Sequence, residues 1–290
     1  MKIAFRRTRV ALLAGLLAAS FVVAKGSQAG QGTNPNYVPE VETQQDTNKQ
    51  LEQRQLNKSV ADLGPKVDPQ EEAAYKAFFD TPEQDVATRI QLGQDFAQKY
   101  PSGPYTEAVY SGLVRAYYAK QDWPNFYSSG DKALALKADD VDVLAMVGWV
   151  IPHLIDPNDT EAGQQLDKAE SFEKRAVVAL ATMTKPTTVT DEEFAKFKAE
   201  KTAEAHSGLG LVYFRRSDFD SAAKELQQAT QAVPNPDPTD LYALGASLFN
   251  LKRFKDAADA FSKCAESPGG LQAPCKQQAD AAKKLAAQAK

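Results

Sequence analysis

The side chains most able to do chemistry in this sequence are its two histidines, His153 and His206. His153 is followed by Asp156 and Asp159, and such a set could bind a metal ion weakly or transfer a proton. Neither histidine, however, has a Cys, His or acidic partner at a recognised metal-ligand spacing. The sequence therefore favours a solvated turn around His153 and a structural role for His206.

Other signatures of catalysis are missing from the sequence. It contains no nucleophile elbow of the Gly-x-Ser-x-Gly kind and no glycine-rich phosphate loop. The acidic run at 191–193 is expected from the preference of a helix N-terminus for negative charge. We therefore expect no enzymatic activity and no cofactor.

The first 29 residues have the pattern of a secretory signal peptide. Four cations precede an uncharged stretch over residues 10–24, and Ser27-Gln28-Ala29 supplies small residues for cleavage. This stretch is shorter than the roughly 20 residues that a spanning helix needs, so an inner-membrane anchor made by an uncleaved signal is the alternative. We expect a periplasmic or secreted protein with no stable membrane span after cleavage.

The chain that follows the signal is acidic and starts with a polar leader. Residues 30–67 are rich in Gln, Asn, Thr and Gly and poor in large apolar residues, so we expect this leader to be disordered. Loss of residues 1–29 removes five cations and no acid, which takes the formal charge from −4 to −9. This charge disfavours nucleic acid as a partner, because phosphate binding needs clustered Lys and Arg.

Cys264 and Cys275 are the only cysteines in the chain and stand eleven residues apart. In an exported protein the oxidising compartment favours a disulfide between them. The alternative is two unpaired thiols, with Cys264 buried as a small apolar residue. A bridge would tie the C-terminal segment 271–290 to the preceding helix and would contribute about 3 kcal/mol.

From residue 68 onward, apolar residues recur at helical spacing, and no segment shows the strict alternation of an exposed strand. Two stretches repeat the same order of residue types 35 positions apart. The first has His206, Leu209, Gly210, Tyr213, Ala222, Leu226, Ala229 and Pro234. The second has Leu244, Gly245, Leu248, Ala257, Phe261 and Cys264.

This order resembles the tetratricopeptide repeat, in which an aromatic residue is followed by Leu-Gly, Tyr, Ala with a bulky residue four positions later, and a closing Pro. His206 replaces the usual Trp. Two further copies are degenerate: in one Phe126 occupies the alanine position, and the other is interrupted over residues 152–163. The resemblance implies an all-α fold, a right-handed solenoid of antiparallel helical hairpins with a C-terminal capping helix.

The repeat spacing divides the chain into hairpins and assigns them a packing pattern. We expect hairpins at about 68–103, 104–140, 141–186, 187–236 and 237–267, with a cap at 271–290. Thr190, with Glu193 three residues later, predicts a helix start that runs on into the next repeat, and a functional insertion is the alternative. The recurring Gly and Ala residues are needed because two helices must approach closely, and larger side chains there would push the layers apart.

The family also implies a binding surface, because its first helices line a concave face that engages segments of other proteins. Aromatic and Arg side chains dominate the energy of such interfaces. The implied partner-binding residues are Arg115, Tyr118, Trp149, Leu211, Phe214, Arg215, Tyr242, Phe249 and Asn250. Two or three of the five aromatics are expected to belong mainly to the core.

The sequence as a whole favours an exported, non-catalytic scaffold that binds a protein or peptide of unknown identity. The segment Lys99–Tyr110 resembles a connector in bacterial envelope proteins of the same repeat family, which suggests a task in cell-envelope assembly. The alternative is a solenoid with a small-molecule or hydrolytic pocket near His153.

Overall fold

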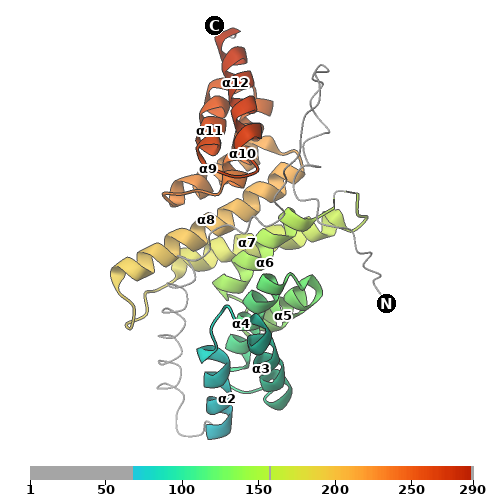
Figure 1. The fold of residues 1–290 in the computed structure, drawn as a ribbon, viewed down its shortest axis with the longest axis vertical. Helices are drawn as coiled ribbons and strands as arrows, with labels where there is room; N and C mark the ends of the chain where they lie inside the picture. The colour runs from blue at the N-terminus through green and yellow to red at the C-terminus, as the bar shows by residue number, and fades with distance from the viewer. Residues whose placement is uncertain (1–67, 157, 289–290) are drawn as a thin grey trace. The chain divides into compact units, whose positions relative to one another are not determined.

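The computed structural model describes residues 68–156 and 158–288, and every regular element in these ranges is a helix. The expected signal peptide (1–29) and leader (30–67) lie outside the described residues. The helices follow one another as hairpins (Figure 1): α2 (Pro69–Asp80) and α3 (Val86–Lys99), α4 (Thr106–Lys120) and α5 (Trp123–Leu136), α6 (Val141–Leu154) and α7 (Ala162–Thr182), α8 (Asp191–Arg215) and α9 (Phe219–Ala232), α10 (Pro238–Asn250) and α11 (Phe254–Glu266), then α12 (Gln272–Gln288). The predicted all-α fold is confirmed.

Consecutive hairpins pack in a regular way from α4 onward. Each first helix contacts the next first helix, α4 with α6, α6 with α8 and α8 with α10. Each second helix packs on the first helix of its own hairpin and on that of the following one. This nearest-neighbour packing is that of a solenoid. Within the described ranges, no helix combines the length and the apolar character that crossing a membrane requires.

Side-chain caps define where many of the helices begin. The carboxylates of Asp68, Asp85 and Asp218 accept hydrogen bonds from backbone N–H groups of the first turn at 2.9–3.2 Å. At α8 the Thr190 hydroxyl accepts from the backbone N–H of Glu193 at 3.2 Å, and the Glu193 carboxylate accepts from that of Thr190 at 2.9 Å. This is the predicted capping box, and α8 runs on from it for 25 residues as one continuous helix.

Three hairpins share the same short turn. Gln121, Ser217 and Lys252 each have a positive φ, of 57°, 60° and 60°, and each donates its N–H to the carbonyl three residues earlier. The turn between α6 and α7 is different, because it spans the residues between Leu154 and Ala162. Pro152 lies in the last turn of α6, so the interruption expected to start there starts three residues later, at residue 155.

The glycines of the first helices allow the second helices to approach closely. A Cβ on Gly210 would lie 2.5 Å from Cγ of Leu226, and one on Gly245 would lie 2.7 Å from Cδ1 of Phe261. A Cβ on Gly148 would meet Cδ of Glu173 at 2.7 Å, so an acid occupies the place of the bulky apolar residue in α7. Any larger residue at these three glycines would force the helices apart.

The α4–α5 hairpin packs in the same way, but in α5 the large residue stands at the usual alanine position and the small residue at the usual bulky position. Phe126, at the alanine position, is completely buried. Gly130, one helical turn later, holds the position that is bulky in the other hairpins, and a Cβ there would meet Cγ2 of Val147 at 2.9 Å. The large ring has moved back by one turn, which explains why Phe126 departs from the repeat.

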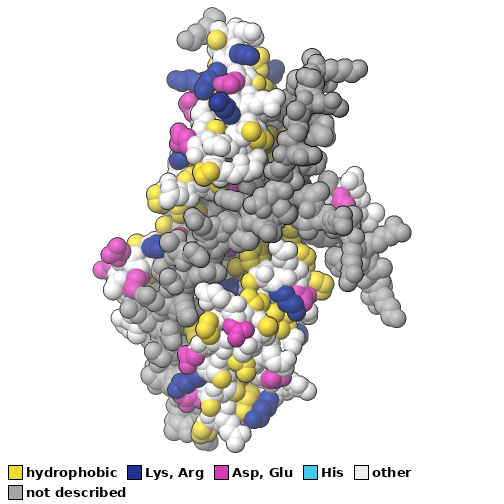
Figure 2. Space-filling view, in the orientation of Figure 1, with side chains coloured by type: hydrophobic (Ala, Val, Ile, Leu, Met, Phe, Trp, Pro, Cys, Tyr) yellow, Lys and Arg dark blue, Asp and Glu magenta, His cyan; other side chains and the backbone are white. Residues whose placement is uncertain are grey.

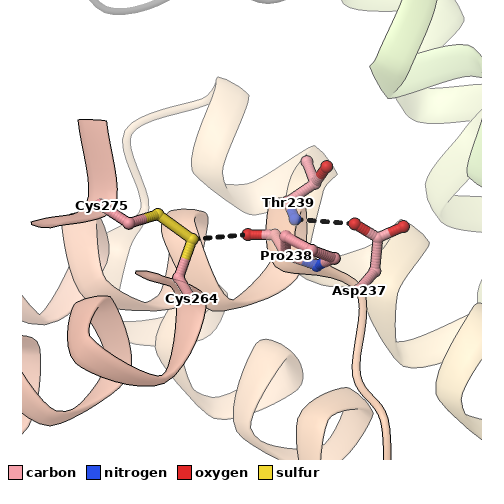
Figure 3. Close-up of a disulfide and its surroundings, with 5 residues drawn as sticks. All are labelled: Asp237, Pro238, Thr239, Cys264 and Cys275. Carbon is pink, nitrogen blue, oxygen red and sulfur yellow. Dashed lines mark hydrogen bonds between the residues drawn. A yellow bond between two sulfur atoms is a disulfide. The ribbon is translucent and has the colours of Figure 1, made fainter. Parts of the chain in front are cut away.

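The last helix is joined covalently to the solenoid. Cys264 of α11 and Cys275 of α12 form a disulfide with a Cα–Cα distance of 5.8 Å, and both residues are fully buried. Sγ of Cys264 lies 3.4 Å from the carbonyl oxygen of Pro238, next to Asp237, whose carboxylate caps α10 by accepting from Thr239 N–H at 2.7 Å (Figure 3). The predicted disulfide therefore connects the cap to α11 and packs against the start of α10.

The outer surface of this end is polar. On the face shown in Figure 2, basic side chains gather over the C-terminal helices. In α12, Lys276 and Lys283 are exposed. A solenoid needs a polar outer face on its terminal element, because no further repeat covers it. The cap meets that need with α12.

Candidate interaction surface

The nine partner-binding candidates lie on α4, α6, α8 and α10, the first helices of four consecutive hairpins. We call the surface that these residues mark the first-helix face. Leu211 and Tyr242 are buried, Asn250 is exposed, and the other six candidates are partly exposed. The six are Arg115, Tyr118, Trp149, Phe214, Arg215 and Phe249.

Four of the five aromatic candidates pack on rings of their own hairpin. Tyr242 lies edge-on to Phe261, with ring centroids 5.4 Å apart. The other three form edge-to-face pairs, at 5.2–6.0 Å, with the first aromatic residue of the following helix. These pairs are Tyr118 with Trp123, Phe214 with Phe219, and Phe249 with Phe254. Each pair brackets one of the short turns, so these side chains stabilise the hairpins whether or not they also contact a partner.

Trp149 differs from the other aromatics because it connects separate repeats. Its Nε1–H donates to Oγ of Ser207 at 3.1 Å, and the Ser207 hydroxyl donates to Oδ1 of Asp240 at 2.6 Å. The chain of bonds runs from α6 through α8 to α10. It therefore fixes the positions of three consecutive first helices relative to one another.

The acid at the end of this chain is buried. Burial raises the pKa of Asp240 to about 8, and the nearby Asp237 carboxylate adds to the rise while the Ser207 hydrogen bond opposes it. Asp240 is therefore mostly protonated at neutral pH. In this form it accepts from Ser207 without placing an uncompensated charge in the interior.

His153 lies beside Trp149 on α6, and the ring centroids are 4.0 Å apart. Its Nδ1 lies 2.7 Å from the carbonyl oxygen of Trp149, and since a carbonyl only accepts, Nδ1 carries the proton. Burial is the main cause that lowers the pKa of His153, so the ring is neutral at pH 7.

The two aspartates that follow His153 in sequence do not join it. Asp156 and Asp159 are exposed, and each accepts from a backbone N–H two residues later at 2.9 Å. In the portion of the chain that the structure describes, no group of three or more His, Cys, Asp and Glu side chains could hold a metal ion. Nothing in this geometry favours the alternative of a hydrolytic pocket at His153.

His206, the second histidine, bonds within its own hairpin. Its Nδ1 lies 2.7 Å from Oε2 of Glu225 on α9, and both side chains are partly buried. The contact joins α8 to α9 near the position where the repeat family usually has Trp. It gives His206 the structural role that the sequence suggested.

Arg215 supplies a basic group close to His153. Its Nε donates to the carbonyl oxygen of Pro152 at 2.9 Å, while Nη1 is buried with no hydrogen-bond partner. Burial lowers the pKa of Arg215 to about 10, which still leaves the guanidinium charged at neutral pH. A buried donor without an acceptor costs free energy, and a carbonyl or carboxylate of a bound segment would remove that cost.

Glu173 is the residue that sequence reasoning missed. It is fully buried on α7, and neither carboxyl oxygen has a hydrogen-bond partner. Burial raises its pKa well above the usual range, with Glu204 adding to the rise and Lys201 opposing it. The repeat alignment carries a signal for it, because Glu173 stands four residues after Ala169, where the other copies have Leu226 or Phe261.

Charged groups of α6 and α8 lie near Glu173. Nζ of Lys201 is 3.0 Å from Oδ1 of Asp142 and 2.8 Å from Oε2 of Glu204. The Lys201 side chain is only 8% exposed, whereas those of Asp142 and Glu204 are 25% and 22% exposed. We call this group, together with Glu173, the α6–α8 seam.

Comparison with known proteins agrees with the hairpin geometry. The family model described as tetratricopeptide repeat matches residues 195–239 and 207–270, which include α9, α10 and α11 and most of α8. Curated protein sequences give no match. The match identifies tetratricopeptide repeats in residues 195–270, and the hairpins of the described residues pack in the manner of that repeat.

Three solved structures are similar to this chain to different degrees. PilW, described as a widely conserved type IV pilus biogenesis factor, is 16% identical with a TM-score of 0.50, over 77% of this chain and 93% of its own. A thermophilic TPR protein of Thermus thermophilus is 17% identical with a TM-score of 0.45, over 73% and 98%. A tetratricopeptide repeat protein from Parabacteroides merdae ATCC 43184 is 13% identical with a TM-score of 0.37, over 75% and 92%. At these identities, the PilW likeness indicates a common solenoid fold and nothing about the partner.

Proposed function

We propose that this protein is an exported, non-catalytic scaffold that binds a peptide or a segment of another protein on its first-helix face. The observation that carries the proposal is the set of polar and aromatic groups around Trp149. There the hydrogen-bonded chain to Ser207 and Asp240 fixes three helices, and Arg215 presents a buried donor with no acceptor. A rigid surface with an unused donor loses little entropy when a segment binds to it.

The proposed compartment is the periplasm or the exterior of a bacterial cell, and the proposed task is assembly of the cell envelope. The signal-like start of the sequence and the disulfide between Cys264 and Cys275 support export. PilW, which has the same fold, is described as a pilus biogenesis factor, which is compatible with such a task. The acidic net charge supports a protein partner over a nucleic acid.

Binding can be tested without knowing the partner. A random heptapeptide library displayed on phage would be panned against the full chain and against a Trp149→Ala/Arg215→Ala double variant. The proposal expects enriched peptides with the wild type and little enrichment with the variant, because both changes remove groups of the first-helix face. Equal enrichment of the same peptides on both proteins would contradict it.

A matched control is available on the second helices. Leu136 of α5 and Val178 of α7 are large apolar residues that are 54% and 65% exposed. The Leu136→Ala/Val178→Ala double variant removes exposed apolar surface away from the first-helix face, so it should select the same peptides as the wild type. Export is tested separately by fusing residues 1–67 to alkaline phosphatase, which is active only after it leaves the cytoplasm.

A further inference from the structure

The carboxyl group of Glu173 does not stabilise the protein in the absence of a bound partner. At the equivalent positions α9 has Leu226 and α11 has Phe261, each of which is almost completely buried against a glycine. Glu173 is just as buried, but both of its oxygens lack a hydrogen-bond partner. A buried, unpartnered carboxyl costs free energy, and groups of this kind are more frequent at functional sites than elsewhere.

The carboxyl points to the boundary between α6 and α8. A Cβ on Gly148 of α6 would lie 2.7 Å from its Cδ, and a Cβ on Gly208 of α8 would lie 2.6 Å from the same atom. The residues next to these glycines are Trp149 and Ser207, which are hydrogen-bonded to each other. The acid is therefore held between two backbones, beside the bond that crosses the first-helix face.

The α6–α8 seam contains more acidic groups than basic ones. Lys201 is the single cation that both Asp142 and Glu204 contact. If Glu173 ionises, its charge adds to those of Glu204 and Asp142 near Lys201, and Lys137 is a further cation that interacts with Asp142. Asp142 and Glu204 are partly exposed, so a second cation can approach these two carboxylates from solvent, whereas Glu173 is fully buried behind them.

We propose that Glu173 binds a basic side chain, the ammonium of lysine or the guanidinium of arginine, supplied by the peptide that occupies the first-helix face. The inference rests on the proposed function and specifies the chemistry of the partner. When the cation enters, the Glu173 carboxyl releases its proton to solvent, and the carboxylate that forms pairs with the incoming charge. One proton leaves for each basic side chain bound.

The proton release makes binding depend on pH. The charged groups that act on the Glu173 carboxyl are Lys201 and Glu204, both from α8. Burial and Glu204 hold the Glu173 pKa high, so at low pH the incoming cation must displace a firmly held proton. Binding should therefore strengthen as the pH rises towards the pKa of Glu173.

The peptide library separates this inference from the proposed function. Glu173→Gln keeps the shape of the side chain and removes its ability to ionise. Wild-type protein should enrich peptides with Lys or Arg at one position, and the variant should still enrich peptides but without that preference. Wild-type peptides that lack any basic preference would overturn the inference and leave the scaffold intact. No enrichment on wild-type protein would count against both.

Calorimetry then measures the proton released when the peptide binds. An enriched peptide is synthesised with Arg and with the neutral isostere citrulline, or with Lys and norleucine, and is titrated in two buffers of different ionisation enthalpy. The full chain should bind the basic peptide about ten- to hundredfold more tightly than the neutral one and should release a proton. Glu173→Gln and Glu173→Leu should lose both effects. Equal affinities, or proton release that persists in both variants, would overturn the proposal, and thermal melting shows that each variant is folded.

Discussion

The hairpins α6–α7 and α8–α9 are adjacent layers of one solenoid, yet they pack their centres with different chemistry. In α8–α9, Gly210 receives the apolar side chain of Leu226, and a short turn at Ser217 joins the helices. In α6–α7, Gly148 receives the carboxyl of Glu173, and a longer connection replaces the short turn. The difference shows that the backbone geometry of the repeat survives an unfavourable side chain at its centre, so the position can serve binding instead of stability.

The apolar centres should account for most of the stability, and Phe261→Ala tests this most strongly. Phe261 is almost completely buried against Gly245 and Tyr242. Its loss should lower the free energy of unfolding by about 3–5 kcal/mol, because a cavity remains in a packed layer. Urea unfolding followed by circular dichroism measures the change. A loss below about 1 kcal/mol would show that α10 and α11 do not depend on this centre.

The acidic centre should respond in the opposite direction. Glu173→Leu replaces an unpartnered carboxyl by the residue that packs on Gly210 in the next hairpin, and it should raise the free energy of unfolding by about 1–3 kcal/mol. Glu173→Gln is the matched control, because it retains a buried polar group and should recover much less. Destabilisation by leucine in the same urea experiment would mean that the carboxyl has a structural partner.

The pH dependence of stability should follow the buried acids. Burial raises the pKa of Asp240 to about 8, and burial with help from Asp140 raises that of Glu107 to about 8. In the unfolded chain these groups ionise near pH 4, so the unfolded state loses protons that the folded state retains. Stability is therefore greatest below about pH 4 for these two groups and falls as the pH rises towards 8.

Asp240→Asn isolates one of these contributions. The amide oxygen still accepts from Ser207, but the side chain no longer ionises. Unfolding midpoints at pH 5 and pH 8 should differ less in the variant than in the wild type. An unchanged difference would indicate that Asp240 is ionised in the folded protein.

The turns provide the smallest expected effect. Ser217 adopts φ of 60°, which costs a residue with a Cβ more than it costs glycine, so Ser217→Gly should stabilise the protein by about 0.5–1 kcal/mol. Ser171 is exposed in the middle of α7, and Ser171→Gly should destabilise it by about 0.5 kcal/mol. Thermal melts of the two variants should shift in opposite directions, and shifts in the same direction would contradict this account of the turn.

The residues that could be predicted from sequence are those whose role is local or repeated. The Leu-Gly positions and the capping box at Thr190 follow from spacing and residue type, and the disulfide follows from the signal-like start and the presence of only two cysteines. The spacing of five between the aromatics of each short turn is also visible in the sequence, and it indicates that Phe214 and Phe249 pack within their own hairpins.

The candidate site depended on contacts that no local pattern specifies. Trp149, Ser207 and Asp240 meet only because α6, α8 and α10 are neighbours in the stack, although 58 and 33 residues separate the bonded pairs. Glu173 was visible as a mismatch between copies, but its lack of partners depends on Gly208 from the next hairpin. The sequence indicates which residues pack, whereas the stacking decides which polar groups remain unsatisfied.

The disulfide between Cys264 and Cys275 makes the C-terminal end of the stack of helices more resistant to unfolding than the other end. A solenoid behaves as a one-dimensional lattice, in which terminal units fray first because they have a single neighbour. With α12 locked to α11, fraying from the C-terminal end is suppressed, so unfolding of the described helices should propagate from α2 towards α12. Reduction of the bridge would make both ends competent to initiate unfolding, and amide hydrogen exchange would then lose its gradient along the chain.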